Sequence, residues 1–147
     1  MMQILAPCAG QVIAITDVAD PVFSAQTVGP GVGIEPDGGR QVVVAPADGT
    51  LLKVSPHAFI LLVGGEIGIL VHIGINTVKL AGQGFEVLAD QGSDVTVGTP
   101  IVAWDPASVT DPSMSRTVVV VVMDAEPDSV SDVAGGTVAT GNPLFTC

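Results

Sequence analysis

The chain has 147 residues, of which 48% are hydrophobic and only 3% aromatic, and its formal net charge is −11. Its four Lys and Arg residues cannot form the basic footprint that nucleic-acid binding needs, and an anionic membrane surface repels a chain of this charge. A basic protein partner is compatible with the charge, and so is simple solubility. The abundant β-branched residues, with 18 Gly and 11 Pro, favour short strands joined by tight turns.

The cysteines and the N-terminus bear on the compartment. Cys8 and Cys147 follow neither a metal-binding nor a disulfide spacing, which fits a reducing environment. Residues 1–10 lack the basic and long apolar segments of a secretory signal. We therefore expect a cytoplasmic protein. Because no linker or low-complexity tract divides residues 1–147, we expect one domain, an all-β antiparallel β-sandwich or barrel-sandwich hybrid with short helical turns.

Two segments in the first third of the chain repeat a pattern. Residues 6–15 (APCAGQVIAI) and 45–54 (APADGTLLKV) share A-P-x-x-G followed by apolar residues. Proline at a strand start and glycine in a tight turn make both segments strand openings.

Residues 58–75 form a long apolar stretch that could be mistaken for a membrane span. The stretch contains Glu66, His72 and the turn-like sequence GGEIG, whereas a span needs about 20 apolar residues with few charges. We interpret it as two strands and a turn centred on Gly64 and Gly65.

The rest of the chain continues the strand pattern. Residues 84–92 (GFEVLADQG) are the best candidate for a short helix. Residues 92–104 are interpreted as two short strands punctuated by Gly98 and Pro100. Residues 116–124 (RTVVVVVMD) are nearly continuous in valine, which is typical of a central strand covered on both faces.

The chain has only two histidines, and the predicted hairpin brings them together. If the turn centres on Gly64 and Gly65, paired residues have numbers that sum to 129, and His57 and His72 then lie directly opposite each other. Alternation places Ser55, His57 and Phe59 on one face of their strand. On the other strand it groups Leu70, His72 and Gly74, with their neighbours facing away: Val71, Ile73 and Ile75.

A histidine pair fits three kinds of chemistry. A zinc site needs further ligands, which only Asp124 or Glu66 could supply. General acid–base catalysis has no accompanying serine or cysteine nucleophile motif. The remaining option is a histidine nucleophile, whose tautomer an acceptor fixes on one nitrogen and whose partner histidine donates a hydrogen bond to a phosphoryl oxygen.

The sequence LVHIGINTVKLAGQGF (70–85) resembles the active-site signature of the glucose-family enzyme IIA domain of the bacterial phosphoenolpyruvate:sugar phosphotransferase system. The resemblance extends over nearly the whole chain, including residues 19–36, 43–51, 92–105 and 118–124. It implies a phosphotransferase that works through a phosphohistidine and needs neither a cofactor nor a metal. The implied partners are the phosphocarrier HPr, as donor, and a IIB domain of a sugar permease, whose cysteine is the acceptor.

The resemblance also implies roles for individual residues. His72 accepts the phosphoryl group on Nε2, and His57 assists it. Gly74 supplies a carbonyl to the other imidazole nitrogen, Ser55 orients His57, and Asp124 lies near the site. Four apolar residues match positions that dock a partner: Val22, Phe23, Ile73 and Val78. The segment before His57 is shorter than the common pattern, and Asn76 stands where many members carry Asp.

Two other classes remain open. A lipoyl or biotinyl carrier shares the hairpins of this chain, but it needs an attachment lysine at a hairpin tip, and Lys53 and Lys79 lie in apolar strand contexts. A zinc-dependent peptidase is disfavoured by the histidine count.

Overall fold

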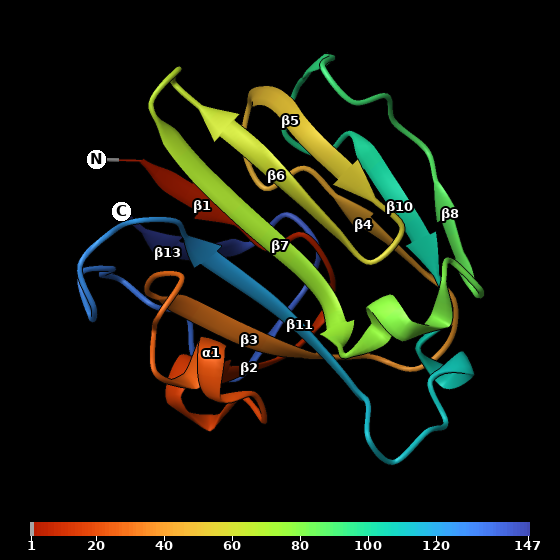
Figure 1. Cartoon of the computed structure of the whole chain (residues 1–147). Helices are drawn as coiled ribbons and strands as arrows, with labels where there is room; N and C mark the ends of the chain where they lie inside the picture. Colours follow the sequence, from red (N-terminus) through yellow and green to blue (C-terminus); the bar gives the residue numbers. More distant parts are fainter. Residues whose placement is uncertain (1) are drawn as a thin grey trace.

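The computed structural model describes residues 2–147, and strands dominate it (Figure 1). The strands are β1 (Gln3–Leu5), β2 (Gly10–Ala14), β3 (Gly31–Pro36), β4 (Gln41–Val44), β5 (Gly49–Ser55), β6 (Ala58–Val63), β7 (Ile67–Ile75), β8 (Phe85–Val87), β9 (Asp94–Val95), β10 (Pro100–Trp104), β11 (Ser115–Val122), β12 (Thr137–Val138) and β13 (Pro143–Thr146). The helical turns are η1 (Ile15–Asp17), α1 (Pro21–Ser24), η2 (Thr77–Leu80) and η3 (Pro106–Ser108).

The strands form three antiparallel sheets. The largest has the order β12-β2-β3-β11-β7-β6-β5-β9, a second has the order β4-β10-β8, and β1 pairs with β13. The inner face of the large sheet packs against the two smaller sheets, and one apolar cluster fills the space between them. The architecture is an antiparallel sandwich of open sheets, which confirms the predicted all-β class.

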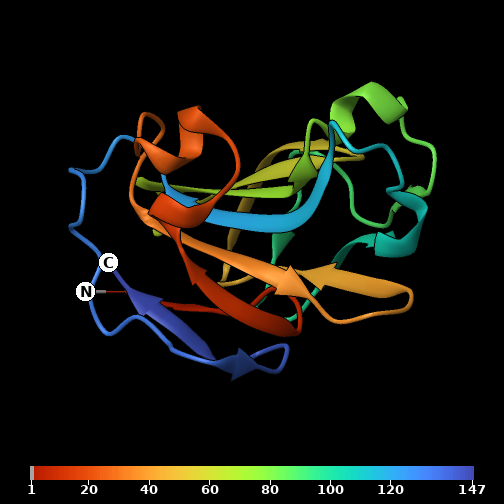
Figure 2. The same cartoon turned by 90° about the horizontal axis from the view of Figure 1, so that it is seen from below.

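The outer face of the large sheet is partly covered. Figure 2 shows α1 on one side of the large sheet, with β1 and β13 on the opposite side. A second apolar cluster sits beneath this cover and includes Ile15, Phe23, Val119 and Val121. His72 is only partly buried and lies against Phe23 at the edge of this cover.

The valine run behaves as its pattern predicts. β11 pairs with β3 on one side and β7 on the other, and all residues from Val118 to Val122 are buried. Val118 and Val120 belong to the inner cluster, while Val119 and Val121 belong to the outer one. Burial on both faces explains why this strand shows no polar alternation.

The predicted helix at residues 84–92 is wrong. Phe85–Val87 forms strand β8, which pairs with β10. The Phe85 and Trp104 rings stack with their centroids 5.6 Å apart and an angle of 11° between planes. This long-range aromatic pair across two strands overrides the weak local helix pattern.

The predicted strands in residues 58–75 and 92–104 are confirmed as β6, β7, β9 and β10. The repeated segments open β2 at Gly10 and β5 at Gly49, as expected. Within residues 2–147 we find no helix with the length and apolar character needed to cross a membrane.

Candidate phosphoryl-transfer site

Strand β7 positions His72 on the outer face of the large sheet. Val71 and Ile73 are fully buried on the inner side, while His72 and Leu70 are only partly buried. Ile75 departs from this alternation, because it packs in the outer cluster with Phe23 rather than in the inner one. The prediction that Ile75 faces away from His72 with Val71 and Ile73 is therefore wrong.

Gly74 causes the change of face. Its φ is +80°, a left-handed conformation that glycine tolerates, and a Cβ there would lie 2.4 Å from Cγ2 of Thr77 and 2.9 Å from the Ser115 carbonyl oxygen. The carbonyl oxygen of Gly74 lies 2.6 Å from Nδ1 of His72. A carbonyl can only accept, so Nδ1 carries the proton and Nε2 carries the free lone pair.

The side chain of Thr77 stabilises the backbone turn at Gly74. Its Oγ1 donates a hydrogen bond of 2.6 Å to the carbonyl oxygen of Ile73, and the residue is only 1% exposed. The bond ties η2 to the end of β7 and fixes the peptide that precedes Gly74. The Thr77 side chain therefore holds the peptide next to the acceptor carbonyl of the His72 ring.

The predicted register of the histidine hairpin is wrong by one residue. The turn holds three residues, 64–66, so Ala58 rather than His57 pairs with His72, and Phe59 pairs with Val71. Phe59 accordingly points into the core, away from the face that carries His72. Glu66 is the third residue of the turn, and the Gly64–Gly65 pair alone does not predict that a third residue belongs to it.

The two imidazole rings nevertheless meet. His57 lies in the turn between β5 and β6, and its carbonyl oxygen accepts a 2.6 Å hydrogen bond from the Ile73 amide. The ring centroids of His57 and His72 lie 5.4 Å apart at 76°, in an edge-on arrangement. The tight turn thus brings His57 to the ring of His72 without a direct cross-strand pair.

The short helix α1 supplies the other wall of the site. Asp20 caps it by accepting a 2.8 Å hydrogen bond from the Val22 amide, and proline follows the cap directly. Phe23 packs on His72 with ring centroids 5.2 Å apart at 58°. Sequence analysis did not single out Asp20, although the Asp-Pro pair is a helix-start signal.

Both histidines are held in the neutral form. Burial lowers the pKa of His72, and a proton on His57 would lower it further; the Gly74 hydrogen bond and the Asp20 carboxylate act in the opposite direction and raise it. Burial lowers the pKa of His57 as well, and the Lys53 ammonium group adds to the shift. Near neutral pH the site therefore presents an uncharged imidazole with its lone pair on Nε2.

Of the four predicted docking residues, two offer apolar surface. Val22 is 49% exposed and Val78 is 57% exposed. Ile73 is fully buried in the inner core, so the prediction that its side chain docks a partner is wrong. Phe23 is only 6% exposed, because most of its ring is covered by the outer cluster.

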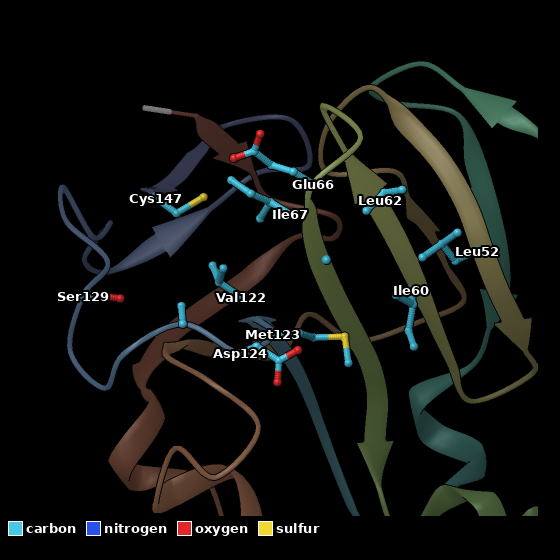
Figure 3. A pocket seen from close by; sticks show the side chains of 12 residues that line it. Leu52, Ile60, Leu62, Glu66, Ile67, Val122, Met123, Asp124, Ser129 and Cys147 are labelled. Carbon is cyan, nitrogen blue, oxygen red and sulfur yellow. The ribbon is translucent and has the colours of Figure 1, made fainter.

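Two hollows lie on the outer face of the large sheet; His57 lines the smaller one, and neither histidine lines the larger one. Lys53, Ser55 and His57 line a small one of about 180 Å³. A larger one of about 740 Å³ lies beside it on the outer face, where Figure 3 shows Asp124 and Met123 on one side of β7 and Ile60 on the other. Among the described residues, Ser55 makes no hydrogen bond to His57, and Asp124 makes none to either histidine.

The described residues contain no group of three or more His, Cys, Asp or Glu side chains that could hold a metal ion. Two histidines without further ligands do not complete a zinc coordination sphere.

Comparison with known proteins identifies the family. Residues 2–127 match the family model described as phosphoenolpyruvate-dependent sugar phosphotransferase system, EIIA 1. The chain is 36% identical to the glucose-specific EIIA component of Buchnera aphidicola, over 97% of this chain and 89% of that protein. It is also 37% identical to the glucose-specific EIIBCA component of Corynebacterium glutamicum, over 85% of this chain, but it spans only 18% of that longer protein.

A solved structure agrees with these sequence relatives. The glucose permease IIA from Mycoplasma capricolum superposes with a TM-score of 0.88 at 32% identity, over 98% of this chain and 94% of that one. The chain belongs to the EIIA 1 family of the phosphoenolpyruvate-dependent sugar phosphotransferase system.

Proposed function

We propose that this protein accepts a phosphoryl group from phospho-HPr on Nε2 of His72 and donates it to a cysteine of a IIB domain during sugar uptake. Residues 1–147 act as one IIA domain in the cytoplasm. Family membership supports the phosphocarrier role, and the site geometry supports His72 as the acceptor. The sugar is chosen by the permease and not by this domain.

The orientation of one ring carries the proposal. The Gly74 carbonyl holds the proton on Nδ1 at 2.6 Å, so Nε2 has its lone pair available. The lone pair forms the new bond to phosphorus as the bond from phosphorus to the donor's leaving atom breaks, and that atom keeps the electron pair. No proton has to leave Nε2, which removes the need for a separate general base.

His57 is the second participant. Its ring meets that of His72 at 5.4 Å between centroids, close enough to donate a hydrogen bond to an oxygen of a phosphoryl group on Nε2. Phosphoryl transfer depends mainly on positioning and charge stabilisation, which a fixed pair of imidazoles supplies without a cofactor. Ser55 lines the small hollow together with His57 and is the hydroxyl nearest to it in the chain, whereas Asp124 lines the larger hollow, which neither histidine reaches.

The partner proteins dock on exposed apolar side chains near the histidines. Exposed Val22 and Val78 flank the histidines and give apolar contact area. The net charge of −11 favours a basic partner and raises its association rate. Phe23 contributes by buttressing the His72 ring.

Incubation with phosphoenolpyruvate, enzyme I and HPr tests the proposal. The wild-type protein is expected to gain one acid-labile, base-stable phosphate, and His72→Ala is expected to gain none. His57→Gln should still accept phosphate but transfer it more slowly to a IIB domain. Equal loss of acceptance in both variants would contradict the separate roles of the two histidines.

A further inference from the structure

Lys53 lies on the same face of the sheet as His72. Two neighbouring rows of cross-strand pairs establish this: Lys53–Ile60–Leu70 and Ser55–Ala58–His72. Directly opposed residues of antiparallel strands point to the same side of a sheet. Lys53 is therefore on the outer face, one row away from the histidine.

Lys53 and His57 line the same small hollow. Lys53, Ser55 and His57 line its polar side, and Phe59 and Leu70 contribute to its apolar side. Its volume of about 180 Å³ leaves room for a phosphoryl group and its water. The three polar side chains can all donate hydrogen bonds, so the hollow suits an anion.

The charge of Lys53 is available for such an anion. The salt bridge found among residues 2–147 joins Arg40 to Glu86 at 4.0 Å and does not involve Lys53. Arg116 is also engaged, since it donates two hydrogen bonds to the Val109 carbonyl. The Lys53 ammonium group instead acts on His57, whose pKa it lowers.

A phosphoryl group at His72 needs a cation close by. The protein carries a net charge of −11, and the Asp20 carboxylate is near enough to His72 to raise its pKa. Phosphoryl oxygens bring further negative charge into this field, and a fixed positive group offsets the repulsion. The histidines are neutral and cannot supply that charge.

We propose that Lys53 is a third phosphoryl-binding residue of the site, with Nζ pairing to a phosphoryl oxygen while the group is on Nε2 of His72. The inference rests on the proposed function and goes beyond it, because it adds a cation to the two imidazoles. No covalent bond changes at Lys53, which keeps its protons and only donates hydrogen bonds.

Phosphorus NMR of the isolated phosphoprotein tests this without a partner present. Lys53→Met should raise the pH at which the phosphorus resonance titrates, because the cation that opposes protonation has gone. Hydrolysis of the phosphohistidine near neutral pH should become roughly fivefold faster, the size expected for one exposed charge pair. Lys53→Arg keeps the charge and should restore both values to near those of the wild type.

Arg40→Met is the matched control, because it removes one positive charge from the Arg40–Glu86 pair and leaves the small hollow intact. Titration and hydrolysis in Lys53→Met equal to those of Arg40→Met would overturn the proposal. The fluorescence of Trp104, the single tryptophan, verifies that each variant is folded. If the wild-type protein itself accepts no phosphate, the proposed function fails, and this inference fails with it. If the wild-type protein accepts phosphate and Lys53→Met has the same titration and hydrolysis as the wild type, only this inference fails.

Discussion

The Nδ1 atom of His72 lies 2.6 Å from the carbonyl oxygen of Gly74, two residues further along β7. The carbonyl reaches the ring because Gly74 adopts a left-handed φ of +80°, which turns the strand at its end. The same turn moves Ile75 to the outer cluster beside Phe23. One backbone conformation therefore fixes the tautomer of His72 and builds the apolar support next to its ring.

Gly74→Ala should both destabilise the protein and slow phosphoryl acceptance. The new Cβ would meet Cγ2 of Thr77 at 2.4 Å, and the left-handed φ is strained for alanine, so we expect a loss of about 3 kcal/mol in the free energy of unfolding. Gly98→Ala is the control, because φ is +87° there but no atom lies within 4 Å of the added Cβ. That variant should lose only about 1 kcal/mol in denaturant unfolding. Equal losses would mean that the close contact at Gly74 is unimportant.

The stability of the protein should depend on pH through His72. Its pKa in the folded state lies below the ordinary value of 6.5, so the unfolded chain binds more protons in the interval between the two values. The contribution of His72 to the free energy of unfolding should therefore be complete above pH 6.5 and should fall as the pH drops through that interval. The difference between wild type and His72→Gln isolates this effect from the carboxylates. A wild type that gains stability relative to the variant on acidification would show a raised pKa instead.

Asn76→Asp should loosen the loop between β10 and β11. Nδ2 of Asn76 donates a 2.9 Å hydrogen bond to the Ser113 carbonyl, and a carboxylate there would repel that oxygen. We expect a cost of about 1 kcal/mol and faster amide hydrogen exchange at Met114. Asn76→Gly suits the φ of +62° and loses the bond without adding repulsion, so it should have the smaller effect. Unchanged exchange in both variants would rule out a role for this bond.

Gln26 and Asp128 should stabilise the segment after β11. The side-chain Nε2 of Gln26 donates a hydrogen bond of 2.9 Å to Oδ1 of Asp128, and the backbone amide of Asp128 donates one of 2.8 Å to Oε1 of Gln26. Gln26→Ala removes both bonds, while the φ of +56° is as strained for alanine as for glutamine. We expect a loss of about 1 kcal/mol in the free energy of unfolding, measured by thermal or denaturant unfolding. Asp128→Asn keeps both bonds and should be nearly neutral. A larger loss in Asp128→Asn than in Gln26→Ala would contradict this assignment.

Features set by side-chain pattern could be predicted from the sequence. The valine run gave the central strand β11, and the glycine-centred apolar stretch gave the hairpin that carries His72. The meeting of His57 and His72 also followed, since a hairpin over this stretch has to bring its ends together. Periodicity suffices where burial on one or both faces dominates.

Features set by backbone geometry and distant contacts could not be predicted in the same way. The register slipped by one because Glu66 joins the turn, which nothing in the local sequence requires. The change of face at Ile75 depends on the φ of Gly74, and β8 depends on Trp104. The position of Asp20 beside His72 arises from the packing of α1 on the large sheet.

The most direct test is to locate the phosphate on the protein. After incubation with phosphoenolpyruvate, enzyme I and HPr, nitrogen-15-labelled protein can be examined for coupling between phosphorus and each imidazole nitrogen. We expect one phosphoryl group, bonded to Nε2 of His72, with Nδ1 still donating to Gly74. Phosphate on Nδ1 of His72, on His57 or on neither histidine would contradict the account.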